Sequence, residues 1–315
     1  MTPRSLCDML LLAALWGASF LFMRISVPEF GPAPMALLRV VGGAAFLLPI
    51  LLWRGQWPAL RQRWLAIGFV GITNSAIPFL CYGFAALTIS AGLASVFNAA
   101  TPLFGALFAW AWLGERLTRW RTLGLLIGMA GVLGLAWNRI GIHAGADSFR
   151  VALAIAACLL ATVLYGFSLA YTKRRLAGLP AMALAAGSQL GAAVALLLPG
   201  VLTWPSALPG VRAWLSLLAL ALLCSGLAYI LYFRLIANLG ATNAGAVTFL
   251  IPVFAMAWGG IFLDEAISLA MVLGCATILV GTALVLGLWP RLAQTRCGTG
   301  EHNDRQVKSL GESGR

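Results

Sequence analysis

Ten long apolar stretches separated by short polar connections dominate this sequence. They cover residues 9–27, 35–53, 64–87, 93–113, 123–137, 151–171, 182–202, 214–236, 244–263 and 269–289. A helix needs about 20 apolar residues to cross the hydrocarbon core of a bilayer. A water-soluble chain would need about a quarter of its residues charged, and here only 10% are. The sequence therefore predicts an all-α integral membrane protein whose ten transmembrane helices lie in a lipid bilayer.

The 21 lysines and arginines predict how the helices are oriented. If the N-terminus is cytoplasmic, the loops on the inner side receive all of them except Arg24, Arg39, Arg139, Arg150 and Arg212. Loops rich in Lys and Arg usually stay in the cytoplasm. We therefore expect both termini on the cytoplasmic side of the inner membrane. The net charge of +12 is explained by these loop cations and not by a basic binding surface, so no nucleic-acid partner is expected.

The two halves of the chain match each other at an offset of 150 residues. Without a gap between positions 75 and 131, Ser75 meets Ser225, Tyr82 meets Tyr232, Pro102 meets Pro252, Glu115 meets Glu265, and Gly124 meets Gly274. Each half has five helices, an odd number, so the second half must have the opposite orientation in the membrane. We therefore divide the chain into a first repeat over 1–148, a second over 149–290, and a polar cytoplasmic tail over 291–315 that we expect to be disordered.

Several short motifs resemble the drug/metabolite transporter superfamily, specifically its EamA-type ten-helix members. They are Leu15-Trp16-Gly17-Ala18-Ser19-Phe20 followed by Arg24, Leu38-Arg39, Pro102, and Leu113-Gly114-Glu115. The second half departs from them with Tyr165 for Trp, Gln189 in place of Arg39, and Asp264 for Gly. The resemblance implies secondary transport by alternating access. Helices 1–4 and 6–9 would surround a central cavity, and helices 5 and 10 would be peripheral.

Polar and aromatic residues inside the predicted helices are the candidates for substrate contact, because polar groups in a membrane usually face a cavity or another helix. On the third predicted helix, Ser75, Phe79 and Tyr82 have the spacing of one helical face. Interhelical packing would explain the same pattern. The candidates are Trp16, Ser19, Ser75, Phe79, Tyr82, Asn98, Thr101, Tyr165, Ser168, Tyr229, Tyr232 and Thr248.

A second set of residues suits a gate or a structural role: Arg24, Arg39, Pro102, Glu115, Pro252 and Glu265. Arg24 and Arg39 lie toward the outer ends of their helices, where each could pair with Glu29, meet a substrate carboxylate, or extend to the membrane surface. Each proline frees a carbonyl at membrane depth. A glutamate at a helix C-terminus opposes the helix dipole, so we expect Glu115 to pair with Arg116, Arg119 or Arg121.

The expected function is transport of a small-molecule substrate, such as an amino acid or a related metabolite. Export is the direction that the resemblance favours. The cysteines and the two histidines show no metal-ligand spacing, so we expect no metal site, no cofactor and no enzymatic activity. An integral-membrane enzyme acting on lipid or prenyl substrates is the alternative, and only Asp264-Glu265 resembles its acid cluster. We expect a monomer or a homodimer.

Overall fold

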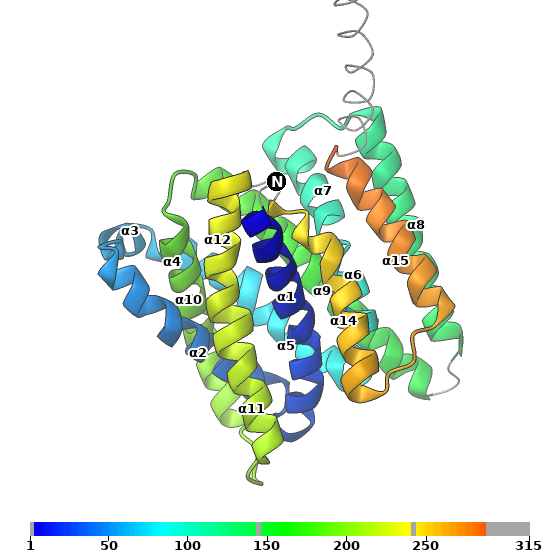
Figure 1. Ribbon diagram of the computed structural model, residues 1–315, viewed down its shortest axis with the longest axis horizontal. Coiled ribbons are helices and arrows are strands. Elements are labelled where there is room, and N and C mark those ends of the chain that lie inside the picture. Colours follow the sequence, from blue (N-terminus) through cyan, green and yellow to red (C-terminus); the bar gives the residue numbers. More distant parts are fainter. Residues whose placement is uncertain (1–2, 143–145, 241–243, 288–315) are drawn as a thin grey trace, which may run out of the picture.

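The computed structural model describes residues 3–142, 146–240 and 244–287, and these ranges contain helices and no strand (Figure 1). The helices are α1 (Pro3–Phe30), α2 (Pro32–Trp53), α3 (Trp57–Gln62), α4 (Trp64–Gly71), α5 (Ile77–Ala86), α6 (Ala91–Asn98), α7 (Thr101–Leu113), α8 (Arg119–Ile142), α9 (Ala146–Arg175), α10 (Ala181–Leu202), α11 (Val211–Ala219), α12 (Ala228–Leu239), α14 (Val247–Leu263) and α15 (Leu269–Val285), with π-helical turns η1 (Ile72–Ala76) and η2 (Leu220–Leu227).

The predicted all-α membrane fold is confirmed. Eight helical spans are long and apolar enough to cross a membrane, and α14 and α15 are shorter apolar helices of 17 residues each. Several helices extend beyond the predicted apolar cores, because polar residues at the membrane surface continue the helix. The first span, for example, begins at Pro3. Residues 288–290 and the predicted tail over 291–315 lie outside the described residues.

The structure corrects two details of the predicted helices. The fourth predicted helix is not continuous, because α6 ends at Asn98 and α7 begins at Thr101. Pro102 explains the break, since a proline ring clashes with the carbonyl four residues earlier, which here belongs to Asn98. The Thr101 hydroxyl donates to that freed carbonyl (2.8 Å). In the third predicted helix, η1 widens the turn before α5, so Ser75 does not follow the regular register of Phe79 and Tyr82.

Helices of one half cross helices of the other at small residues. A Cβ atom at Gly17 in α1 would lie 2.7 Å from the Cβ of Phe254 in α14, and one at Gly166 in α9 would lie 2.6 Å from the backbone N of Gly105 in α7. Gly17 and Gly166 occupy equivalent positions at an offset of 149. The two equivalent crossings show that the internal repeat extends to the packing of the helices.

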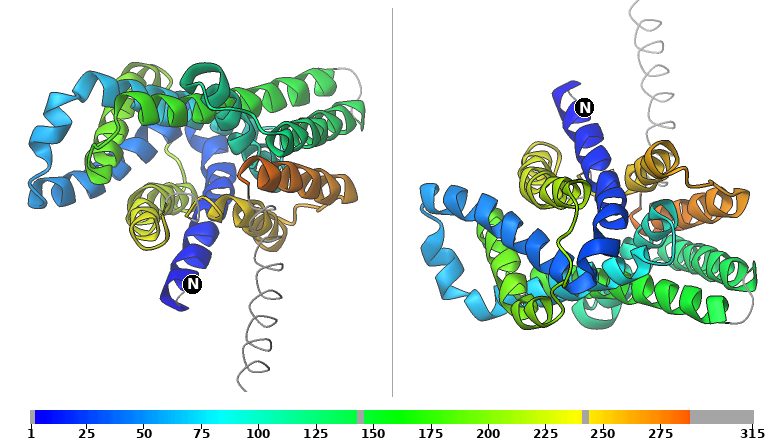
Figure 2. Two further views of the ribbon diagram at one scale, coloured as in Figure 1. Left: turned by 90° about the horizontal axis from the view of Figure 1, so that it is seen from above. Right: turned by 90° about the horizontal axis from the view of Figure 1, so that it is seen from below.

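The α8 and α15 helices form a separate pair at the edge of the bundle away from α2 and α4 (Figure 2). Their backbones meet at glycines: a Cβ atom at Gly281 would lie 2.5 Å from the Cα of Gly128. Small residues allow such close approach of helices in membranes. These are the fifth and tenth predicted spans, and their position agrees with the peripheral place that the resemblance implied.

Candidate functional site

The candidate residues fall at three levels: the two ends of the bundle and the space between them. We call the end where α1 begins the N-terminal end, which is at the top of Figure 1, and the other the opposite end. The start of α1 contacts α12 through Asp8, which pairs with Arg234. The end of α1 and the residues that follow it meet α11, where the Gly210 amide donates to Glu29. The Asp8–Arg234 contact therefore marks one end of the bundle, and the Glu29–Gly210 contact marks the other.

At the opposite end, Glu265 connects three segments of the chain. Its carboxylate lies 3.6 Å from the Arg24 guanidinium and accepts from the backbone amide of Ala91 at 2.9 and 3.1 Å. Arg24 also donates to the carbonyl of Ala86. Pairing with Glu29 was one of three alternatives for Arg24, and within the described residues Arg24 pairs with Glu265 instead. Glu265 lies nearer because α14 ends beside α1.

At the N-terminal end, Glu115 makes the corresponding contacts. It pairs with Lys173 and, at 3.4 Å, with Arg121. Arg121 was one of its expected partners, whereas Lys173 was not expected. The hydrogen bond from Lys173 lowers the pKa of the Glu115 carboxyl below its ordinary value, and Arg121 acts in the same direction. Glu115 thus stays charged well into the acid range.

Between the two ends, Arg39 is buried, with 5% of its surface exposed. Its Nε donates to Ser225 Oγ at 3.0 Å, its Nη1 lies 3.5 Å from the Met23 sulfur, and its guanidinium carbon lies 3.6 Å from the centre of the Phe79 ring. The guanidinium therefore lies inside the bundle and does not extend to the membrane surface.

A second polar side chain, Gln189 on α10, lies beside this arginine. Its side chain and that of Ser225 both approach α2 at Gly43, one turn beyond Arg39: a Cβ atom there would lie 3.2 Å from the Cβ of Ser225 and 3.6 Å from the Cδ of Gln189. The Tyr229 hydroxyl lies close to the side chains of Gln189 and Ser75. The amide of Gln189 and the hydroxyl of Ser75 are fully buried, and within the described ranges neither forms a hydrogen bond of standard geometry.

Aromatic pairs flank this cluster. The rings of Trp16 and Tyr232 are 5.2 Å apart, and those of Tyr165 and Tyr82 are 6.2 Å apart. These are equivalent pairs, because Trp16 corresponds to Tyr165 and Tyr232 corresponds to Tyr82 in the two repeats. The Tyr82 hydroxyl also donates to the side-chain oxygen of Asn98 (3.1 Å). The structure thus brings these candidates together in two groups, Trp16 with Tyr232, and Tyr82 with Tyr165 and Asn98.

Four of the remaining candidates use their hydroxyls in structural hydrogen bonds. Ser19, Thr101 and Thr248 each donate to the carbonyl three residues earlier, and Ser168 bonds to Thr73 (2.6 Å). Their hydroxyls already have partners, so a solute would have to compete for them. Pro252 lies inside α14, which continues through it.

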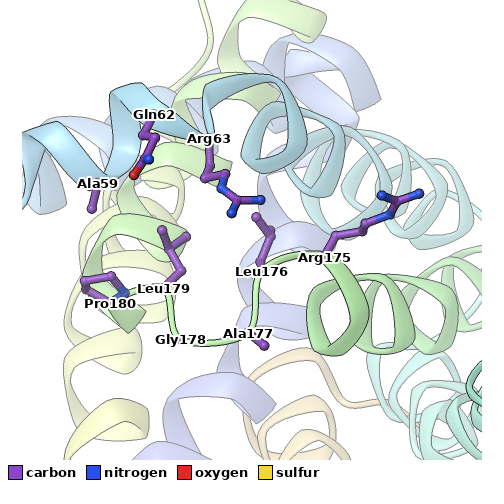
Figure 3. Close-up of a pocket in the computed structure, with 9 residues that line it drawn as sticks. All are labelled: Ala59, Gln62, Arg63, Arg175, Leu176, Ala177, Gly178, Leu179 and Pro180. Carbon is purple, nitrogen blue, oxygen red and sulfur yellow. The ribbon is translucent and has the colours of Figure 1, made fainter.

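Two pockets of the structure lie away from Arg39. One, of about 250 Å³, opens where the junction of α3 and α4 meets the loop after α9, and Figure 3 shows Arg63 beside Leu176 while Arg175 extends away from the other lining residues. The other, of about 360 Å³, is a groove between α8 and α15 near Gly134 and Gly274. The side chains of Arg39, Gln189 and Ser75 are buried in this conformation.

The family comparison decides the class of protein. The model of the EamA-like transporter family matches residues 4–137 and 152–287. The chain belongs to the EamA-like transporter family. It is a membrane permease of that family, as the sequence motifs predicted. The two matches correspond to the two repeats.

Relatives and a solved structure agree with this assignment. The chain is 26% identical to the uncharacterized transporter YvbV of Bacillus subtilis (strain 168), over 87% of this chain and 88% of YvbV. It is 27% identical to the uncharacterized inner membrane transporter YedA of Escherichia coli (strain K12), over 86% and 87%. A protein of known crystal structure aligns with a TM-score of 0.64 at 25% identity, covering 93% of this chain and 99% of that one.

Sequence reasoning missed two residues of the central cluster. Gln189 was noticed only as a departure from the motif around Arg39, and Ser225 only as the match of Ser75. The sequence did contain a signal for them. Both are polar residues in long apolar stretches, and their equivalents at an offset of 150, Arg39 and Ser75, were candidate residues.

Proposed function

We propose that this permease moves small metabolites, such as amino acids or related compounds, across the inner membrane by alternating access, and that it works as an exporter. The observation that carries the proposal is a relationship between ion pairs. Arg24 with Glu265 at one end corresponds to Lys173 with Glu115 at the other, because the internal repeat matches Arg24 to Lys173 and Glu265 to Glu115.

Two equivalent ion pairs at opposite ends suit a carrier that opens one end at a time. In such a carrier, each pair would hold its end closed and release when that end opens. The energy of an exposed ion pair is modest, about 0.2 to 1 kcal/mol. A modest energy suits this role, because each ion pair must break and form again in every transport cycle.

The two ends differ in this conformation, which supports the same proposal. The side chain of Glu265 is 15% exposed and that of Glu115 is 32% exposed, although they are equivalent. At the opposite end, α1 packs extensively against α11, and Phe30 packs edge-on against Trp214 (4.9 Å). The equivalent helices at the N-terminal end, α9 and α4, share only a small contact. The opposite end is therefore the more tightly closed one.

Transport by the purified protein in liposomes tests the proposal. Vesicles loaded with one unlabelled amino acid or related metabolite at a time would be diluted into labelled solute. A carrier gives counterflow that saturates with solute concentration and is absent from empty liposomes. Flux that rises without saturation would overturn the carrier in favour of a pore.

The direction of transport has its own measurement. Everted membrane vesicles from cells that produce the protein should accumulate the solute faster than right-side-out vesicles, because export moves solute away from the cytoplasmic face. Faster accumulation in right-side-out vesicles would reverse the proposed direction.

A further inference from the structure

The centre of the bundle contains one polar arrangement twice. Arg39 contacts Ser225 and the ring of Phe79. At an offset of 150, Arg39 corresponds to Gln189, Ser225 to Ser75, and Phe79 to Tyr229. The side chains of Gln189, Ser75 and Tyr229 also lie together. The prolines inside the two helices, Pro49 in α2 and Pro199 in α10, follow the same offset of 150. The two arrangements are therefore equivalent, and they differ in that only one carries a charge.

The charge of Arg39 has no counterion on the described chain. The four ion pairs there use Arg24, Arg121, Lys173 and Arg234. The acidic residues of the described ranges lie in loops or toward helix ends; they are Asp8, Glu29, Glu115, Asp147, Asp264 and Glu265. A buried charge in a membrane protein is normally paired, because removing it from water is costly. One hydrogen bond and an aromatic ring compensate only part of this cost.

The same cluster has unused hydrogen-bonding capacity. A guanidinium carries five N–H donors, and the contacts of Arg39 through Nε and Nη1 use only some of them. Both amide atoms of Gln189 and the hydroxyl of Ser75 are buried without a hydrogen bond of standard geometry, and the Tyr229 hydroxyl is the polar group beside them. These groups converge from three segments of the chain, on α2, α10 and η1. Convergent unsatisfied groups are what a polar ligand would satisfy.

We propose that Arg39, Gln189 and Ser75 form the binding site for a small solute that carries one carboxylate group. The Arg39 guanidinium would hold the carboxylate through two parallel hydrogen bonds, which is the geometry that its planar fork favours. Gln189 and Ser75 would hold a second polar group of the solute. This assignment rests on the proposed transport function and names the chemical class of its substrate.

The single charge and the flanking rings define the solute further. One cation is neutralised by one carboxylate, whereas a phosphate with two charges would leave an excess negative charge in the buried site. Tyr165, which is paired with Tyr82, lies near Arg39, and Tyr232, which is paired with Trp16, lies near Tyr229, so these rings provide aromatic walls beside the cluster. An apolar or aromatic substituent on the carboxylate-bearing solute suits such walls.

Binding to the purified full-length protein tests this assignment without requiring transport. The probes are leucine, phenylalanine and their 2-hydroxy acid analogues, each compared with its amide, which lacks the carboxylate. The readout is the rise in melting temperature with probe concentration. At least one carboxylate should stabilise the wild-type protein, and its amide should bind at least tenfold more weakly. Absence of stabilisation by every carboxylate, or equal stabilisation by the amides, would overturn the assignment.

Substitutions then locate the site. Arg39→Gln should weaken carboxylate binding at least tenfold without lowering the melting temperature of the solute-free protein, because it removes an unpaired buried charge. A structural arginine would behave oppositely, so a lower melting temperature with unchanged binding would overturn the assignment. Arg212→Gln is the matched control, because Arg212 is exposed at the start of α11. It should leave binding unchanged.

The internal repeat provides a second variant. Combining Arg39→Gln with Gln189→Arg moves the charge to the equivalent position, where Ser75 and Tyr229 replace Ser225 and Phe79. The combined variant should regain carboxylate binding, and continued loss of binding in a folded protein would count against the equivalence of the two positions. If wild-type protein binds carboxylates but shows no counterflow, the transport proposal fails and the binding site stands.

Discussion

Gly17 and Gly166 occupy equivalent positions in the two repeats, and each brings its helix into contact with a helix of the other half. Gly17 in α1 meets α14 beside Phe254, and Gly166 in α9 meets α7 beside Phe104. Phe254 and Phe104 are themselves equivalent at an offset of 150. These two crossings are therefore equivalent contacts between the two halves of the chain.

Replacing Gly166 by alanine should destabilise the protein. The added Cβ would lie 2.6 Å from the Gly105 backbone nitrogen and 2.7 Å from the Phe104 carbonyl carbon, and backbone atoms cannot move aside easily. Overpacking of this kind costs about 1 to 3 kcal/mol, which outweighs the gain of about 1 kcal/mol in helix propensity. Gly134→Ala in α8 is the control, because no atom lies within 4 Å of its added Cβ. Thermal unfolding in detergent should show a lower melting temperature for Gly166→Ala alone.

Neutralising the two glutamates should shift the carrier in opposite directions. Glu115→Gln removes the pair with Lys173 and should favour opening of the N-terminal end, whereas Glu265→Gln should favour opening of the other end. Apparent affinity follows the fraction of molecules open to a given side. With about 0.2 to 1 kcal/mol for each pair, the ratio of the two open states should change by up to about fivefold, so the apparent KM measured from the N-terminal side should fall in Glu115→Gln and rise in Glu265→Gln.

Vesicles of known orientation provide this measurement, because substrate is added to one side at a time. The combined variant should lie closer to the wild type than the more affected single variant, since the two shifts oppose each other. Changes in the same direction for both single variants would contradict a role in alternating access and indicate a shared effect on stability.

The stability that Lys173 contributes should depend on pH. Lys173 holds the pKa of Glu115 below its ordinary value, so the pair stabilises the folded state above the ordinary glutamate pKa. This stability is lost as the pH falls through the lowered pKa of the folded state. Lys173→Ala should therefore have a lower melting temperature than the wild type at pH 7, and the two should converge in the acid range below pH 4.5. A difference that persists through this range would assign the effect to packing.

The features that follow from hydrophobic length and residue repetition could be predicted from the sequence. The apolar spans appear as helices because the length that crosses a bilayer is fixed. The match of Pro102 to Pro252 and of Glu115 to Glu265 indicated the repeat, and the family model matches the two halves separately. These predictions depend on spacing along the chain alone, which the sequence displays directly.

Contacts between distant helices could not be predicted in this way. Glu29 lies five residues from Arg24 and was one candidate partner, but Arg24 pairs with Glu265, because α14 crosses α1 at Gly17. The burial of Arg39 depends on where Ser225 and Phe79 approach α2. The internal repeat was a usable signal for these ion pairs. It matches Arg24 with Lys173 and Glu265 with Glu115, so a pair in one half indicates the equivalent pair in the other.

The Phe79 ring should contribute to stability through the charge above it. The Arg39 guanidinium carbon lies 3.6 Å from the ring centre, and a desolvated contact of this type is worth about 2 kcal/mol. Phe79→Leu keeps an apolar side chain but removes the ring face, so it should lower the melting temperature. Phe79→Tyr introduces the residue found at the equivalent position, Tyr229, and retains the ring face, so it should remain close to the wild type. Thermal unfolding of Phe79→Leu in the Arg39→Gln background completes the test, because without the charge the loss of the ring should have a smaller effect. An equal effect in both backgrounds would show that Phe79 acts by packing alone.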